Sequence, residues 1–184
     1  MTVFTNPSSR SRDDSFRYVA AVRALVGSRD PIDVLSETVA SIESAVAPLT
    51  DDQARQVEAK GKWSVASVVQ HLADAEVVWA YRIRMVLAED RPQITGWDQD
   101  RWAERLRYDE IGMTQTLSEF GALRRMNLRL LSRVRPDDLN AVGIHAERGR
   151  ESGRDLLVQW AGHDLLHLNQ LARIRSALRG PAQV

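Results

Sequence analysis

The stretch of residues 154–178, RDLLVQWAGHDLLHLNQLARIRSAL, has the periodicity of an amphipathic helix. With Leu156 set to zero and about 100° per residue, its apolar side chains fall within roughly 60° of one another around the helix axis. His163 and His167 lie in the middle of this stripe, at about −20° and about +20°, and Gln170 lies at about −40°. The helix therefore presents two histidines to the protein interior. The stripe is defined by Leu156, Trp160, Leu171, Ile174 and Leu178.

Two histidines four residues apart stand one helical turn above the other, so both rings can reach the same metal ion. Inside an apolar stripe both rings must stay neutral and both must find hydrogen-bond partners. A bound metal meets both needs, and so does a pair of core histidines bonded to backbone carbonyls. The spacing alone leaves these two interpretations equally open.

A third histidine is predicted to face the interior from a second helix, which begins after the N-cap Ser64 and continues to about residue 88. With Val65 at zero, the apolar arc of this helix runs from about −140° to about +40°, and His71 lies at about −120°, near one edge. An inward histidine near the border of a helix is well placed to meet a neighbouring helix. Three histidines from two helices would form a three-nitrogen site for Zn²⁺ or Ni²⁺ with open coordination positions.

Other polar residues share the predicted interior with these histidines. Glu76 lies at about +20° on the second helix, too far around from His71 for the two to share a metal. Arg124 and Asn127 fall in the apolar stripe of a further helix, 112–134. An inward arginine needs a carboxylate partner, which is either Glu76 or an acidic group of a substrate. The candidates for contacting the substrate or supporting the metal ligands are therefore Gln170, Arg124, Glu76 and Asn127.

The remaining segments complete the predicted architecture. Asp30-Pro31 is a helix start, and the helix that follows should stop near Pro48. Four long amphipathic helices in all predict an all-α four-helix bundle over residues 30–184. Residues 1–29 form an N-terminal extension, with a polar, mobile tail to about residue 14 and a possible short helix over 16–26.

Two connectors between the predicted helices stand out. The loop over residues 91–102 contains Gly96 and two tryptophans, and an aromatic-rich loop of this length is expected to pack over another part of the protein. The turn-rich connector over 137–153 carries His145, which we expect to face solvent and to lie outside any metal site.

The composition excludes several classes of protein. The 184 residues include no cysteine, so disulfide scaffolds, iron–sulfur clusters and cysteine nucleophiles are ruled out. The charges balance at 25 basic and 25 acidic residues, which gives no field for attracting nucleic acid or an anionic membrane. No uncharged run approaches the roughly 20 residues of a membrane span, and the N-terminus lacks the apolar stretch of a signal peptide. We therefore expect a cytoplasmic protein with a small-molecule substrate.

The order and spacing of several short motifs resemble the DinB/YfiT-like family from about residue 30 to 178. The first motif leads from Trp63-Ser64 into His71, and the second is the tryptophan-containing loop over 97–102. The third is HDLLHLNQ over residues 163–170. Each motif alone is weak, but together they are fairly specific to this family.

The resemblance implies an up-down-down-up four-helix bundle that carries a divalent metal, with His71, His163 and His167 as its ligands, and often a homodimer. Members of the family include S-transferases that use low-molecular-weight thiols such as bacillithiol or mycothiol, and others are described as metal-dependent hydrolases. A shared fold does not choose between these activities.

Three functions are therefore open. In the first, the metal activates an external thiol for transfer to an electrophile, and Arg124 binds a carboxylate of the thiol or the substrate. In the second, the metal activates water and the protein is a hydrolase. In the third, the metal has no catalytic role and holds the helices of a binding or stress-response module together. The third function predicts a fourth protein ligand, such as His145 or a carboxylate, because structural zinc sites usually have four.

Overall fold

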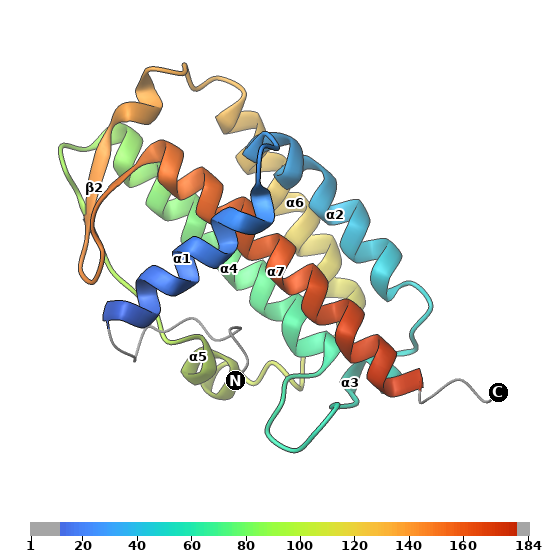
Figure 1. The fold of residues 1–184 in the computed structure, drawn as a ribbon. Helices are drawn as coiled ribbons and strands as arrows, with labels where there is room; N and C mark the ends of the chain where they lie inside the picture. The colour runs from blue at the N-terminus through green and yellow to red at the C-terminus, as the bar shows by residue number, and fades with distance from the viewer. Residues whose placement is uncertain (1–11, 180–184) are drawn as a thin grey trace.

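The structure is a computed structural model and describes residues 12–179 (Figure 1). It is mostly helical, as the sequence predicts, and four long helices form its body. These are α2 (Pro31–Val46), α4 (Val65–Ala88), α6 (Met113–Leu131) and α7 (Gly153–Arg179). The remaining helices are α1 (Arg12–Val26), α3 (Asp51–Arg55), α5 (Gln99–Arg105) and the 3-10 turn η1 (Asp138–Asn140).

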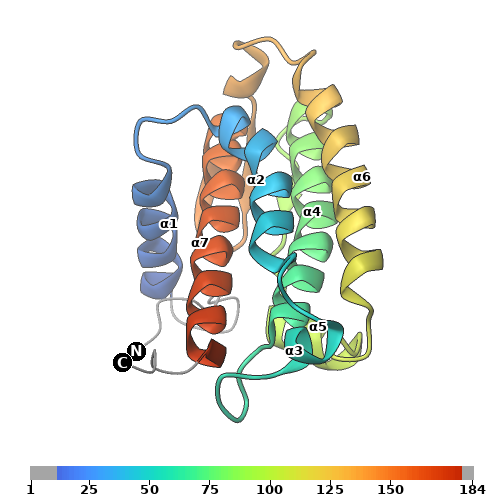
Figure 2. The ribbon, with the colours of Figure 1, turned by 90° about the vertical axis from the view of Figure 1, so that its right-hand side faces the viewer.

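The four long helices have the up-down-down-up topology implied by the family resemblance. The colour gradient in Figure 1 shows α2 and α7 running in one direction and α4 and α6 running in the other. Figure 2 shows the same helices side by side with α1 on the outside of α7. Because α4 and α6 are consecutive long helices and run parallel, the chain must cross from the end of α4 back to the opposite end of the bundle before α6 begins. The connector over 89–112 makes this return and carries α5.

The predicted helix ends are confirmed by their capping hydrogen bonds. The Asp30 carboxylate accepts from the Ile32 amide at the start of α2, and the Ser64 hydroxyl accepts from the Ser67 amide at the start of α4. At the start of α7 the amide of Asp155 donates to the hydroxyl of Ser152, while the Asp155 carboxylate accepts from the Ser152 amide. Each helix start is thus encoded within a few residues of itself.

A small sheet, which the sequence reading did not predict, joins the two long connectors. Its strands are β1 (Gln93–Ile94), β2 (Val142–His145) and β3 (Gly149–Ser152), in the order β1-β2-β3. β2 and β3 form an antiparallel hairpin, and β1 pairs in parallel with β2, so that Ile94 lies opposite His145. The expectation that His145 faces solvent is wrong: it is only 2% exposed, because the hairpin turns it inward.

The polar residues of the interior lie between two apolar clusters. One cluster uses the C-terminal half of α4 and the N-terminal part of α7, around Trp79 and Trp160. The other uses the N-terminal half of α4 and the C-terminal half of α7, around Leu72 and Leu171. The candidate site residues on α7 fall between these two stretches of the helix. The site therefore occupies a polar layer across the middle of the bundle.

Helix α1 packs against α7, and two glycines make this packing possible. Gly27 ends α1 with a positive φ of 61°, which favours glycine. Gly162 lies on α7 where α1 crosses it, and a Cβ there would lie 2.7 Å from the Cβ of Val22 and closer still to the Val22 carbonyl oxygen. The predicted tail over residues 1–14 lies outside the described residues, except for 12–14, which are helical.

Across residues 12–179 there is no helix long and apolar enough to cross a membrane.

Replacing Gly162 by alanine is predicted to destabilise the protein by about 1–3 kcal/mol, because the new methyl group collides with the backbone of α1. Urea denaturation would measure the change. Gly121→Ala in α6 is the matched control, because a Cβ at this mid-helix glycine meets only the flexible end of Arg125 (3.3 Å) and Val39 (3.6 Å), so the variant should be about as stable as the wild type. Equal stability of the two variants would contradict the close approach of α1 and α7.

Candidate metal centre

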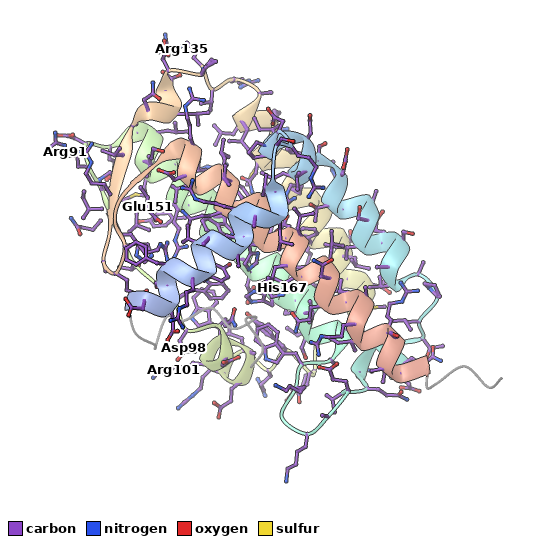
Figure 3. The ribbon with its side chains drawn as sticks, in the orientation of Figure 1. Arg91, Asp98, Arg101, Arg135, Glu151 and His167 are labelled. Carbon is purple, nitrogen blue, oxygen red and sulfur yellow. The ribbon has the colours of Figure 1, made fainter. Side chains whose placement is uncertain are left out.

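Three histidines from two helices converge in the middle of the bundle. His71 comes from α4, and His163 and His167 come from consecutive turns of α7. One potential ligand atom from each ring lies within 4.8 Å of the other two, and all three side chains are buried. Figure 3 labels His167 on the middle of α7. The structure thus brings together the three residues that the sequence singled out.

The hydrogen bonds around the rings determine where the protons lie. Nδ1 of His167 is 2.7 Å from the side-chain oxygen of Gln170, and Nδ1 of His163 is 3.5 Å from a carboxylate oxygen of Asp164. Both partners accept hydrogen bonds, so both Nδ1 atoms carry protons and both Nε2 atoms are left unprotonated. Nε2 of His71 and Nε2 of His163 are 3.0 Å apart, so without a metal a proton on His71 must lie between them.

This donor set fits a divalent metal ion. If the proton of His71 moved from Nε2 to Nδ1, three unprotonated Nε2 atoms would face the centre, and imidazoles in this form are good ligands for Zn²⁺ and Ni²⁺. Nδ1 of His71 is also buried and, among the described residues, has no hydrogen-bond partner. No fourth histidine, aspartate or glutamate of the described chain joins the three-histidine group, and the chain has no cysteine.

Burial keeps the ring nitrogens ready to bind a metal. It lowers the pKa of His71 well below the usual value, and the neighbouring His167 and His163 lower it further. Burial also lowers the pKa of His167 to about 3, with His163 acting in the same direction. Both rings are therefore neutral at pH 7, and no proton has to be removed from an imidazolium before a metal binds.

A buried ionic network supports the α7 histidines. Arg124 of α6 donates to Asp164 (2.6 Å) and makes two-nitrogen contact with Glu76 of α4 (2.7 and 3.0 Å). It also donates to the Leu35 carbonyl of α2 at 2.7 Å, so one guanidinium connects all four long helices. Burial would raise the pKa of Asp164, but the Arg124 charge outweighs this and lowers it, so the carboxylate that faces His163 stays ionised.

The network also settles what the other predicted candidates contact. Glu76 accepts from Arg124, from the Asn127 side-chain amide (2.9 Å) and from the Trp160 ring nitrogen (3.2 Å). Of the two partners predicted for Arg124, the structure shows Glu76, with Asp164 as a second carboxylate, and the guanidinium is 1% exposed, which leaves it closed to a carboxylate of a thiol or substrate. Glu76 and Asn127 are equally buried and do not face a substrate. Gln170 lies where predicted, beside a histidine.

Three tryptophans enclose the histidines. Trp97 stacks on His71 with ring centres 5.2 Å apart and planes 10° apart, and Trp63 lies on His71 at 4.9 Å. Trp79 meets His163 edge-on at 6.2 Å. The expectation that the tryptophan-containing loop packs over something is confirmed, and what it covers is the histidine site. Pairing of β1 with β2 directs the loop to this position.

Two residues near the site were not predicted from the sequence. Asp164 lies at about 80° on the wheel of α7, just outside the apolar stripe. Arg82 of α4 lies at about −100°, within about 20° of His71, so its position on the wheel already marked it as inward-facing. The structure places Arg82 beside Trp79 and leaves it 7% exposed.

These features together define a four-helix-bundle protein with a buried three-histidine site of the kind that binds divalent metals. The sequence profile of the DinB superfamily matches residues 35–171, most of the bundle and all three histidines. The chain belongs to the DinB superfamily.

Individual relatives agree with this assignment. A protein of Oceanobacillus iheyensis is 29% identical over 135 residues, which are 72% of this chain and 78% of that protein. YfiT of Bacillus subtilis is 28% identical over 152 residues, covering 77% and 82% of the two chains. The names of both suggest a metal-dependent hydrolase. The solved structure of YfiT, described as having an unusual four-helix bundle topology, superimposes with a TM-score of 0.70 at 25% identity over 79% of this chain and 86% of YfiT.

Replacing Arg124 by methionine is predicted to destabilise the protein by about 3–5 kcal/mol, because Glu76 and Asp164 would be left buried and unpaired. Urea denaturation would measure the loss. Arg135→Met is the matched control: it removes the exposed partner of Asp138 and should change stability little. A similar small effect for both variants would show that the buried network does not hold the bundle together.

The metal-free protein should lose stability as the pH falls below about 6.5. In the unfolded chain the histidines take up protons near that pH, whereas folded His167 does so only near pH 3. The unfolded state therefore binds more protons over this range, and His167 contributes up to about 1.4 kcal/mol per pH unit. Denaturation in a chelator at several pH values would measure the slope. His167→Leu should reduce the slope by the amount that one proton contributes. A slope unchanged in this variant would contradict the low pKa of His167.

Proposed function

We propose that this protein is a metal-dependent hydrolase whose ion is held by His71, His163 and His167. The observation that carries the proposal is the convergence of three buried imidazoles without a fourth protein ligand among the described residues. Three protein ligands and an open position are typical of catalytic rather than structural zinc sites. When bound, such an ion acidifies a water molecule or thiol that it contacts and so supplies a nucleophile near neutral pH.

The room beside the histidines favours water as that nucleophile. A cavity of about 10 Å³ is lined by His163, Trp79 and Trp97 together with polar side chains from the β2–β3 hairpin. This volume holds about one water molecule, whereas most of a low-molecular-weight thiol would have to lie outside it. The hydrolase names of the relatives agree with this choice.

The surrounding residues have separate tasks in this proposal. Gln170 and Asp164 accept hydrogen bonds from the Nδ1–H groups of His167 and His163, which fixes each ring with its Nε2 toward the centre. Arg124 holds Asp164 in the ionised state. Trp97 and Trp63 cover His71 and keep bulk water away from the ligands.

Thiol transfer is the second candidate, and one observation favours it. A chain without cysteine must borrow any thiol it uses, and an open groove of about 900 Å³ beyond Trp97 is large enough for a low-molecular-weight thiol and an electrophile. In both candidates the three histidines have the same role, and only the nucleophile differs.

Protein purified without an affinity tag is predicted to contain about one divalent ion per chain, Zn²⁺ or Ni²⁺, and His167→Ala is predicted to lose it, because two imidazoles bind the ion far more weakly than three. Elemental analysis would measure the metal. His145→Gln is the control, because His145 lies outside the group and its removal should leave the metal content unchanged. Wild-type protein that takes up no Zn²⁺ or Ni²⁺ even from solution would overturn the site.

Zinc-loaded and nickel-loaded proteins would then be tested on chromogenic esters, amides and phosphoesters, and on monochlorobimane with a panel of cellular thiols. Hydrolysis that is lost in chelator and in His167→Ala supports the hydrolase. Metal-dependent consumption of a thiol, with no hydrolysis, would replace it by the transferase.

A further inference from the structure

Two cavities meet at the tryptophan loop. The outer one is the groove of about 900 Å³ between α4 and α5, with an apolar lining that includes Val77, Tyr81, Met85, Trp97, Trp102 and Leu106. The inner one is the cavity of about 10 Å³ that reaches His163. Arg82, Gly96 and Trp97 line both, so the small cavity is the polar inner end of the groove.

Arg82 is a buried cation without a counter-ion at this junction. No carboxylate of the described residues lies within 4.0 Å of its guanidinium nitrogens, and its one side-chain hydrogen bond there goes to the Thr95 carbonyl oxygen at 2.6 Å. Its other N–H groups are not among the buried atoms that lack a partner. They are therefore accessible from the cavities that the side chain lines. Burial lowers the pKa of Arg82 to about 10, which leaves it charged at pH 7.

The acidic groups near Arg82 are already engaged elsewhere. Both oxygens of Glu151 accept from Arg148, and one also accepts from Gln159. Glu147 accepts from the Ser15 hydroxyl at 2.7 Å. A buried arginine that pairs directly with no carboxylate of residues 12–179 is suited to take one from a ligand.

The inner cavity contains two further polar atoms with unused hydrogen-bonding capacity. Nδ1 of His145 accepts from the Glu147 amide at 3.2 Å, so its proton lies on Nε2, which is buried and has no partner in the described chain. Gln159 donates to Glu151, and its side-chain oxygen is buried and likewise unpartnered there. Both residues line the inner cavity, which has about the size of one water molecule, and buried polar atoms are rarely left unsatisfied in proteins.

The outer groove has a matching electrostatic character. Besides Arg82, the groove is lined by Arg101 and Arg105, while Asp98 is the single acidic residue among its described lining. The carboxylate of Asp98 caps α5 by accepting from the Arg101 amide. Figure 3 labels Asp98 and Arg101 at α5. The groove therefore combines an aromatic floor with an excess of positive charge.

We propose that the groove binds an organic acid with an apolar body, whose carboxylate is held by Arg82 at the entrance to the histidine site. The apolar body lies against Tyr81, Trp97 and Trp102, and the cavity between His145 and Gln159 takes one water or hydroxyl group beside it. That this acid is a substrate rests on the proposed function, whereas its binding does not. The carboxylate-binding role that the sequence suggested for Arg124 thus passes to Arg82.

The test measures binding to the full-length, chelator-treated protein, so that it does not depend on the metal. The probes are 4-phenylbutyrate and its neutral isostere 4-phenylbutyramide, followed by calorimetry and by tryptophan fluorescence from Trp97 and Trp102. We expect the acid to bind at least about tenfold more tightly than the amide, the difference typical of a charge-assisted pair. Arg82→Met should abolish this preference, and Tyr81→Ser should weaken both probes equally.

Two controls keep the outcome clear. Arg129→Met removes an exposed arginine of α6 and should keep the preference. Arg82→Gln removes the charge while it keeps a donor for Thr95, and it replaces Arg82→Met if circular dichroism shows that variant unfolded. Equal binding of acid and amide to the wild type, or a preference that survives loss of the charge, would overturn the proposal. So would a dimer that excludes both probes and dissociates on Tyr81→Glu, because a second copy would then occupy the groove.

The same titration with His167→Ala separates the two proposals. If this variant lacks the metal and still prefers the acid, the Arg82 site stands whether or not the metal is catalytic. If zinc-loaded wild type hydrolyses model substrates but shows no preference for acids, the proposed function stands and the Arg82 site fails.

Discussion

The rest of the structure depends on the buried ion pairs of the Arg124 guanidinium with Glu76 and Asp164. A charge this deeply buried is costly unless every neighbour compensates it, and the compensation here comes from a carboxylate on α4, a carboxylate on α7 and a carbonyl on α2. Because these partners belong to different helices, the network is satisfied in only one relative arrangement of the bundle. The apolar clusters above and below supply most of the stabilisation, but they tolerate small shifts between helices that the ionic layer does not. The same layer fixes Asp164, which in turn orients His163.

The tryptophan loop covers the histidine site and also forms a wall of the groove beside it. In the proposed function the histidines are kept from bulk water, while a reactant still has to reach them. Trp97 serves both needs, since one face of the ring covers His71 and its surroundings form the wall of the groove. The loop owes its position to two short strands, β1 and β2, which pair although they are about fifty residues apart in the sequence. The bundle thus provides the ligands, and the small sheet provides the access to them.

The helices and the inward-facing histidines could be predicted from the sequence, because both depend on residues that are close together in the chain. Helix starts such as Asp30 and Ser64 are set by side chains within three residues of the cap, and the His163–His167 spacing follows from the helical repeat. The sheet could not be predicted, because strands of two and four residues are too short to show a sequence pattern and form only by pairing with each other. His145 was misplaced for that reason. Arg124 was correctly predicted to face inward, but its true partners were settled only by packing, and Arg82 was overlooked although it shares a helix face with His71.

The contact between Gly162 and α1 joins parts of the chain that are made far apart in time. During synthesis α1 and α2 leave the ribosome long before α7, against which both pack. Until α7 appears, the first helices have no native partner for much of their apolar surface, and Arg124 meets Glu76 without Asp164. The bundle therefore cannot close until α7 has been made, and before that the nascent chain exposes apolar surface of the kind that chaperones bind.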